Sequence, residues 1–148
     1  MFGFGKGKIE IQLDKYNYSP GETIQGNITL DLKKQLKARG VFVTLYGEKK
    51  VRQMSSTTQG TSIQRVFEFK QPLDKAGEYP PTLKNYTFHI KIPSNILSGQ
   101  APEGVLGNIV KAAQFLGGSS AMIQWYIDAR IDIPMGIDVS RRVQINIA

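Results

Sequence analysis

The segment Tyr16-Asn-Tyr-Ser-Pro-Gly-Glu-Thr-Ile-Gln-Gly-Asn-Ile-Thr-Leu30 joins two stretches of chain in which apolar residues recur at every second position. The first stretch carries Ile9, Ile11 and Leu13, and the second continues the alternation from Ile24 to Leu32. A period of two is typical of a strand that buries one of its faces. The pattern predicts two strands, 8–14 and 23–32, connected by a tight turn.

The turn itself is expected at Ser19-Pro-Gly-Glu22. Proline at the second position fixes φ and glycine at the third accepts a positive φ, so the sequence favours a type II β-turn. A glycine inside a strand often marks the close approach of another backbone, which is what we expect of the glycine four residues after the turn. The residues predicted to shape this reversal are Tyr18, Pro20, Gly21, Glu22 and Gly26.

The same alternation continues through most of the chain. It predicts further strands at 41–52, 63–71, 84–92, 121–134 and 143–147, with Pro72 and Pro93 ending two of them. In 63–71 the alternation places Phe67 and Phe69 on one face and Val66 on the other. Successive strands at this spacing predict an all-β sandwich of about seven to nine strands.

One segment, Pro102 to Gly118, follows a different period. Its apolar residues recur at intervals of three and four, which is typical of an amphipathic helix: Val105, Leu106, Ile109, Val110, Ala113 and Leu116. Proline suits the first helical position and the glycine pair at the far end suits a C-cap. We therefore predict one short helix inserted at about 102–118.

Two roles are open for this helix. Its apolar stripe would pack onto an open end of the sandwich, or it would offer an apolar contact to a partner or a membrane. The residues of that contact would be Leu106, Ile109, Val110 and Phe115.

Three motifs in order along the chain resemble the arrestin-like family. They are Tyr18-Ser-Pro-Gly-Glu-Thr-Ile-Gln-Gly26, Gly40-Val-Phe-Val-Thr-Leu-Tyr-Gly47 and Trp125-Tyr-Ile-Asp-Ala-Arg-Ile-Asp-Ile-Pro134. The resemblance implies an immunoglobulin-like (arrestin-like) β-sandwich over residues 1–148, equivalent to one arrestin N-type domain, as in microbial arrestin-like and sporulation-control-like proteins. Animal arrestins carry their short helix before the strand that corresponds to 86–92, so the helix predicted here is an addition to the family pattern.

The chain has 148 residues, a formal net charge of +7 and no cysteine. This length corresponds to one domain. The lack of cysteine excludes disulfides and thiolate chemistry and fits a reducing compartment. The first residues do not resemble a signal peptide, and no apolar run reaches the length of a membrane span. We expect a cytoplasmic protein, with peripheral attachment to a membrane left open.

The positive charge falls in three groups. In arrestin relatives a basic concave face can hold an acidic or phosphorylated tail, which implies that these side chains bind an anionic partner. The alternative is that they lie on separate solvated edges, where lysine prevents edge-to-edge association of strands. The candidate residues are Lys33, Lys34, Lys37, Arg39, Lys49, Lys50, Arg52, Arg141 and Arg142.

The sequence offers little for catalysis or metal binding. His89 is the only histidine, and the alternation places it on the exposed face of its strand. Asp128 and Asp132 would lie ~13 Å apart along one strand, with Arg130 between them, which is too far for a glycosidase pair. Ion pairing on a solvated face explains these residues better than a metal site that also uses Asp138. We expect no cofactor and no metal.

The combined reading is a non-catalytic protein-interaction module, an adaptor or scaffold, whose partner is a protein with an acidic or phosphorylated tail. Larger family members join two such sandwiches, so a homodimer is an open alternative for this chain. Two other functions stay open: a basic domain that binds a membrane surface or, with less support, nucleic acid, and a sandwich-fold hydrolase that would depend on His89.

Overall fold

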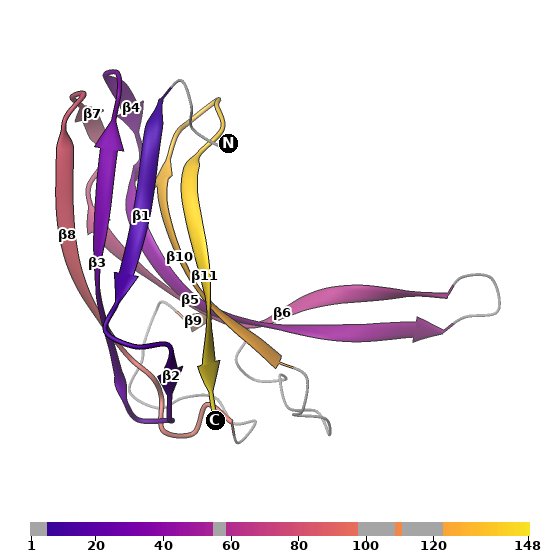
Figure 1. Ribbon diagram of the computed structural model, residues 1–148. Coiled ribbons are helices and arrows are strands. Elements are labelled where there is room, and N and C mark those ends of the chain that lie inside the picture. The colour runs from indigo at the N-terminus through magenta and orange to yellow at the C-terminus, as the bar shows by residue number, and fades with distance from the viewer. Residues whose placement is uncertain (1–5, 55–58, 98–108, 111–122) are drawn as a thin grey trace.

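The computed structural model describes residues 6–54, 59–97, 109–110 and 123–148, with side chains placed for 6–50, 62–97 and 123–148 (Figure 1). Within these residues the chain forms strands and no helix. Seven strands have seven or more residues and four have two or three. The strands are β1 (Gly7–Leu13), β2 (Asn17–Tyr18), β3 (Thr23–Leu32), β4 (Leu36–Ala38), β5 (Gly40–Met54), β6 (Gln59–Asp74), β7 (Gly77–Tyr79), β8 (Leu83–Lys91), β9 (Ile109–Val110), β10 (Ile123–Asp132) and β11 (Val139–Ile147).

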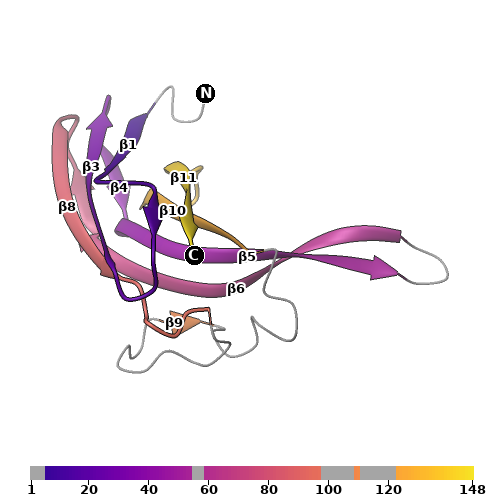
Figure 2. The same ribbon diagram turned by 60° about the horizontal axis from the view of Figure 1, so that its bottom comes forward.

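Two sheets form the sandwich. One has three strands in the order β1-β3-β8, and the other has six in the order β2-β11-β10-β5-β6-β9. A small pair, β4 and β7, lies at the end where β1 begins (Figure 1). Figures 1 and 2 show the three-stranded sheet as one wall and β5, β10 and β11 as the facing wall. The predicted all-β sandwich is therefore confirmed.

The core lies between the two walls and is made by the alternate residues that the sequence predicts. Ile24, Ile28 and Leu30 of β3 face Leu45 of β5 and Ile127 of β10 across the core, and all five are fully buried. Burial of each such side chain stabilises the fold by about 1.5–3 kcal/mol, so the paired faces supply most of the cohesion of the domain.

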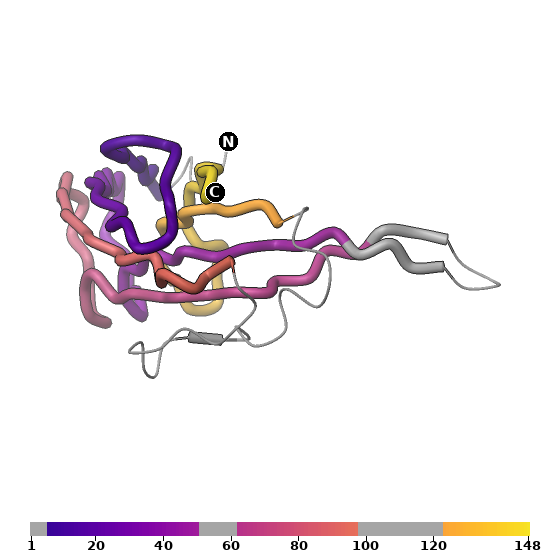
Figure 3. The backbone as a smooth tube through the Cα atoms, turned by 90° about the horizontal axis from the view of Figure 1, so that it is seen from below, coloured from indigo at the N-terminus to yellow at the C-terminus, as the bar shows by residue number. Residues whose placement is uncertain are grey.

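β5 and β6 continue beyond the sandwich as a long hairpin (Figures 1 and 3). Strand β10 pairs with β5 only as far as Lys49, opposite Ile123. From Lys50, which pairs with Ile63, to Met54, which pairs with Gln59, the described backbones of β5 and β6 pair with each other alone.

The predicted turn is confirmed in detail. The Glu22 amide donates to the Ser19 carbonyl at 3.1 Å, and Gly21 has φ +91°, as a type II turn requires. Tyr18 is 3% exposed, and its hydroxyl lies 2.6 Å from Asp14 Oδ1 and 2.8 Å from the Lys15 carbonyl. The aromatic residue before the turn therefore anchors the loop between β1 and β3 to the core.

The long hairpin departs from the predicted pattern at two bulges. Gly47 pairs with Phe67 and Glu48 with Arg65, so Val66 is an extra residue and is buried beside Phe67. The prediction that Val66 faces away from Phe67 is wrong because a bulge resets the alternation. The second shift lies beside Pro72, which pairs with Phe42, and β6 runs on to Asp74. Proline is tolerated at a bulge, so Pro72 does not end the strand as predicted.

The predicted helix at 102–118 is not supported. Of that range the structure describes only Ile109 and Val110, which form β9 and pair with Phe69 and Glu68 of β6. The remaining positions, including Leu106 and Phe115, lie outside the described residues. A pair of β-branched residues favours an extended conformation at a sheet edge, while glycines at 104 and 107 weaken the helical alternative by about 1 kcal/mol each.

Candidate binding face of the six-stranded sheet

The outer face of the six-stranded sheet carries a stacked pair of tyrosines. Tyr46 of β5 pairs directly with Tyr126 of β10, and their rings stack at 5.3 Å with an interplanar angle of 26°. Although both point away from the core, Tyr46 is 3% and Tyr126 is 9% exposed. Two guanidinium groups cover them: Arg65 lies 3.7 Å from the centre of the Tyr46 ring and Arg142 lies 4.2 Å from that of Tyr126.

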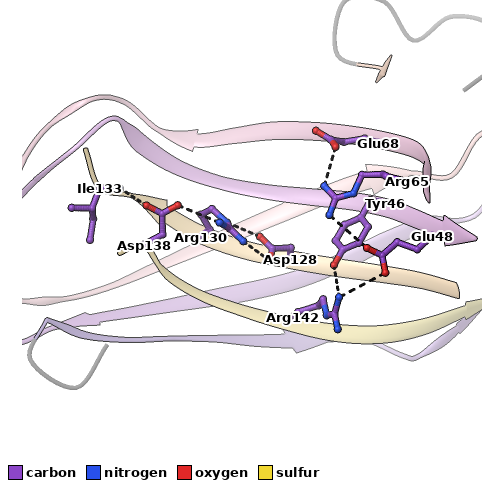
Figure 4. Close-up of polar contacts among 9 residues, drawn as sticks. All are labelled: Tyr46, Glu48, Arg65, Glu68, Asp128, Arg130, Ile133, Asp138 and Arg142. Atoms are coloured by element: carbon purple, nitrogen blue, oxygen red, sulfur yellow. Dashed lines mark hydrogen bonds and ion pairs between the residues drawn. The ribbon is translucent and has the colours of Figure 1, made fainter. Parts of the chain in front are cut away.

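Carboxylates on the same face hold these arginines in place (Figure 4). Arg65 Nη1 donates to Glu68 Oε1 at 2.9 Å, and Glu48 lies 3.9 Å from both Arg65 and Arg142. Arg142 also donates to the Tyr46 hydroxyl at 3.0 Å. Burial raises the pKa of Tyr46 while the Arg142 hydrogen bond opposes that rise. The result is a connected aromatic and ionic network that spans β6, β5, β10 and β11.

A second ionic cluster lies further along β10. Arg130 donates to both carboxylate oxygens of Asp128, at 3.2 and 3.3 Å, and to Asp138 at 3.2 Å (Figure 4). The hydrogen bond to Asp128 raises the pKa of Arg130 further. Asp138 also accepts the Ile133 amide at 2.8 Å, which fixes the chain after β10. Asp132 pairs with Arg39 at 3.2 Å.

These pairings assign the aspartates to ion pairs. Each of the three carboxylates considered as a metal ligand has an arginine partner, and no group of three or more metal-ligating side chains occurs in the described residues. The solvated, ion-paired face that the sequence favours is what the structure contains.

A shallow depression of about 320 Å³ lies between the two clusters. Lys70 stands 4.2 Å above the Phe42 ring at its margin. Most of its charges are already paired within the face, so the depression suits the polar side chains of a partner rather than a chemical step. Its lining residues are Phe42, Thr44, Tyr46, Arg65, Glu68, Lys70, Asp128 and Arg130.

The three predicted basic groups lie apart. Lys33, Lys34, Lys37 and Arg39 surround the short strand β4 at one end of the sandwich. Lys49 and Lys50 lie where β5 leaves the sandwich, ~30 Å along the strand from Arg39 by the rise per residue, and the side chain of Arg52 lies outside the described residues.

The third group divides between two faces. Arg142 lies opposite Asp128 in the tyrosine network, whereas Arg141 lies opposite buried Ala129 and is exposed at the edge of the sandwich. The backbone therefore does not bring the three groups onto one face.

His89 lies on the exposed face of β8, as predicted, opposite Gln25. Within the described residues no hydrogen bond or ion pair involves its side chain. It borders a shallow depression over Gly26, whose lining includes one carboxylate, Asp14, and that carboxylate accepts a hydrogen bond from Tyr18.

Sequence reasoning did not identify Arg65, Glu48 and Glu68 as one site with the tyrosines. The available signal was aromatic residues at outward positions of two long strands, which favours cross-strand pairing. The two arginines that cover the tyrosine rings, Arg65 and Arg142, lie on β6 and β11. The alternation of apolar residues does not reveal the register of these strands against β5 and β10.

No helix in the described part of the chain is long and apolar enough to cross a membrane.

Comparison with known proteins gives a family and a fold. The sequence profile of the arrestin (or S-antigen) N-terminal domain matches residues 8–148. The crystal structure of Spo0M, a sporulation control protein from Bacillus subtilis, superposes with a TM-score of 0.64 at 18% identity, covering 97% of this chain and 50% of that chain. The chain thus spans about half the length of that structure. No curated protein sequence matches the chain.

Arrestin-fold proteins are in general not enzymes, and the ion-paired outer face is consistent with that. The facing sheets, the Pro-Gly turn and the match over residues 8–148 agree with one another, and the chain belongs to the arrestin family as an arrestin N-terminal domain.

Proposed function

We propose that this domain is a non-catalytic adaptor that binds an extended, acidic or phosphorylated segment of a partner protein along β1. The observation that carries the proposal is the open edge of β1. Within the described residues β1 pairs only with β3, and it runs beside β11 without pairing to it (Figure 1).

The hydrogen-bond pattern shows which backbone groups of β1 are available. The Lys33 amide donates to the Lys6 carbonyl, and the Asp14 amide donates to the Gln25 carbonyl. Because bonded and non-bonded pairs alternate in an antiparallel ladder, the backbone groups of Ile9, Ile11 and Leu13 point toward the open edge. An extended peptide can use such groups as an added strand.

Side chains along this edge suit the same ligand. Ile11 and Leu13 of β1 and Val143 of β11 pack against the core yet stay partly exposed, so apolar side chains of a peptide can cover them. Lys8 of β1 and Arg141 of β11 are exposed at the ends of the two strands that start together, where they favour carboxylate or phosphate groups.

The test uses an eight-residue fluorescent peptide selected from an acidic and phosphorylated library on the wild-type domain. Ile11→Pro removes one donor from the open edge without removing a bond to β3. We expect Ile11→Pro to weaken binding at least about tenfold in fluorescence anisotropy, as expected for loss of a backbone pairing site. Ile11→Val, which keeps the amide, is the matched control.

Circular dichroism would establish that both variants are folded. Equal affinity of Ile11→Pro and Ile11→Val, or a library that yields no binder, would refute the proposed strand addition. Binding that survives Ile11→Pro but is lost in Arg65→Ala would assign the partner to the tyrosine face instead.

A further inference from the structure

The turn between β10 and β11 exposes two large apolar side chains. Met135 is 105% and Ile137 is 74% exposed, the two highest values among the large apolar residues of the described part. Single exposed apolar residues are ordinary, but two in one turn form a small protruding apolar surface, which we call the apolar tip. Met135 also has φ +58°, a left-handed conformation that is uncommon outside glycine. The turn therefore holds Met135 outward at a conformational cost of roughly 1 kcal/mol.

Basic residues support the base of this turn. Lys6 Nζ donates to the Ile137 carbonyl at 2.8 Å, and the Lys6 carbonyl accepts the Lys33 amide at 2.8 Å. On the other side the Arg39 amide donates to the Asp132 carbonyl at 2.7 Å. The tip is thus fixed to the start of β1, which bonds in turn to the residue after β3, and the end of β10 is fixed to the residue between β4 and β5.

The end of the sandwich that carries the tip is cationic. The two aspartates that flank the tip are ion-paired, Asp132 with Arg39 and Asp138 with Arg130, which Asp138 shares with Asp128. Two further carboxylates at this end, Asp31 and Glu78, lie on the strand positions directly opposite Lys8 and Lys37. Among the described residues Lys6, Lys33 and Lys34, at the same end of the sandwich, form no ion pair, so their positive charges stay available.

We propose that this end of the domain docks on an anionic lipid bilayer, with Met135 and Ile137 entering the acyl boundary and the surrounding lysines contacting anionic headgroups. Shallow apolar insertion with a cationic surround is the combination that gives reversible binding to such a surface. Each lysine near an anionic surface adds about 1 kcal/mol to the free energy of binding. The charges therefore attract the domain to the membrane, and the two apolar side chains hold it there by insertion. Binding to nucleic acid would account for the positive charges but not for the exposed apolar side chains of Met135 and Ile137.

This orientation is compatible with peptide binding. β1 and β11 both begin at the docking end and run away from it (Figure 1), so the unpaired edge of β1 would stand upright on the bilayer. The peptide-binding edge of β1 and the membrane-docking turn use different residues. A substitution can therefore abolish one activity and leave the other intact.

The experiment uses the cysteine-free chain, which accepts a single labelled cysteine. Met135→Cys carrying the environment-sensitive dye NBD would be titrated with vesicles of phosphatidylcholine and phosphatidylserine, 70:30, or of phosphatidylcholine alone. We expect a blue shift, an intensity increase and quenching by lipids with spin-labelled acyl chains, with the anionic vesicles only. Ile63→Cys is the matched control, because Ile63 is 60% exposed on the distant hairpin.

Unlabelled variants separate insertion from charge. In vesicle co-sedimentation, Met135→Ser/Ile137→Ser should lower the bound fraction about tenfold at equal lipid, while Ile63→Ser should bind as the wild type does. Both sites are exposed, so these variants should fold normally, and the selected acidic peptide should bind the double variant unchanged.

The proposal would be overturned by no binding to anionic vesicles, by equal binding of the double serine variant and the wild type, or by a Met135→Cys label that stays in a water-like environment on bound protein. Equal loss of binding in Ile63→Ser would also overturn it, since the tip would then have no special role. None of these results would bear on peptide binding at β1.

Discussion

Gly26 is the residue on which three strands of the smaller sheet depend for their close approach. A Cβ added there would lie 2.7 Å from the Gln12 carbonyl oxygen and 2.9 Å from side-chain atoms of both Leu13 and Phe88. The first contact is with backbone and cannot be relieved by a rotamer change. We expect Gly26→Ala to lower the free energy of unfolding by about 1–3 kcal/mol in urea denaturation.

Gly136→Ala provides the comparison for that measurement. The added Cβ would lie close to two side-chain atoms, Lys6 Nζ at 3.2 Å and Ile133 Cγ2 at 3.3 Å, while the nearest backbone atom, the Pro134 carbonyl oxygen, lies at an ordinary contact distance of 3.9 Å. Its free energy of unfolding should stay within about 0.5 kcal/mol of the wild type. Equal destabilisation by both substitutions would mean that contact with the Gln12 backbone does not set the cost at Gly26.

Tyr18 and Asp14 form a pair whose contribution depends on pH. The hydrogen bond from Tyr18 holds the pKa of Asp14 below its ordinary value of 3.8, and burial with the Asp14 contact raises the pKa of Tyr18. Because the Asp14 pKa is lowered in the folded state, the stabilisation is present above pH 3.8 and is lost as the pH falls below it.

The substitution Tyr18→Phe isolates this pair. At pH 7 it should lower the free energy of unfolding by about 1 kcal/mol, since a partly buried hydrogen bond to a charged group is lost. The difference between wild type and variant should shrink when urea denaturation is repeated at pH 5, 4 and 3. A difference that is constant over this range would contradict the assigned role of Asp14.

Among the elements, the β5–β6 hairpin divides into a part that belongs to the sandwich and a part that does not. Residues 50–54 and 59–63 pair only with each other in the described backbone. Replacing residues 50–63 by Asn-Gly would join Lys49 to Gln64, which are already paired, through a two-residue turn. We expect the shortened domain to unfold cooperatively with a Tm within about 5 °C of the wild type, because no described core residue is removed.

Thermal unfolding followed by circular dichroism measures this directly. A domain that loses its cooperative transition when the hairpin is shortened would show that the projecting strands also stabilise the sandwich. Replacing only residues 52–61 by Asn-Gly, which keeps two more residue pairs of the hairpin, would locate where that support begins.

The alternation of apolar residues was sufficient to predict the long strands but not the irregularities within them. Val66 and Pro72 were misjudged because a bulge shifts the face of one strand relative to its partner, and only the pairing reveals it. The strand at Ile109 and Val110 was missed for a related reason: a short apolar run fits either period, and contact with β6 decides between them.

At the scale of the whole molecule, the alternation of apolar residues was enough to predict the sandwich fold, but it was not enough to predict the tyrosine and arginine network on the outer face of the six-stranded sheet. The outward positions of Tyr46 and Tyr126 could be predicted from alternation, and the ion-paired state of Asp128 and Asp132 was expected. The convergence of Arg65 and Arg142 on the tyrosines requires the alignment of four strands distant in sequence. The same holds for Lys6 beneath the β10–β11 turn, a contact across 131 residues.

The central place of β10 has a consequence for how the protein is made. All three strands of the smaller sheet have been synthesised once Lys91 is added, but one edge of β5 stays without its partner until β10 is completed at Asp132. The nascent chain must therefore carry a long apolar strand, paired with β6 on one edge and unpaired on the other, while residues 75–132 are translated. Such late closure of distant partners favours slow folding and a period of vulnerability to aggregation, during which a chaperone that shields β5 would raise the yield of native protein.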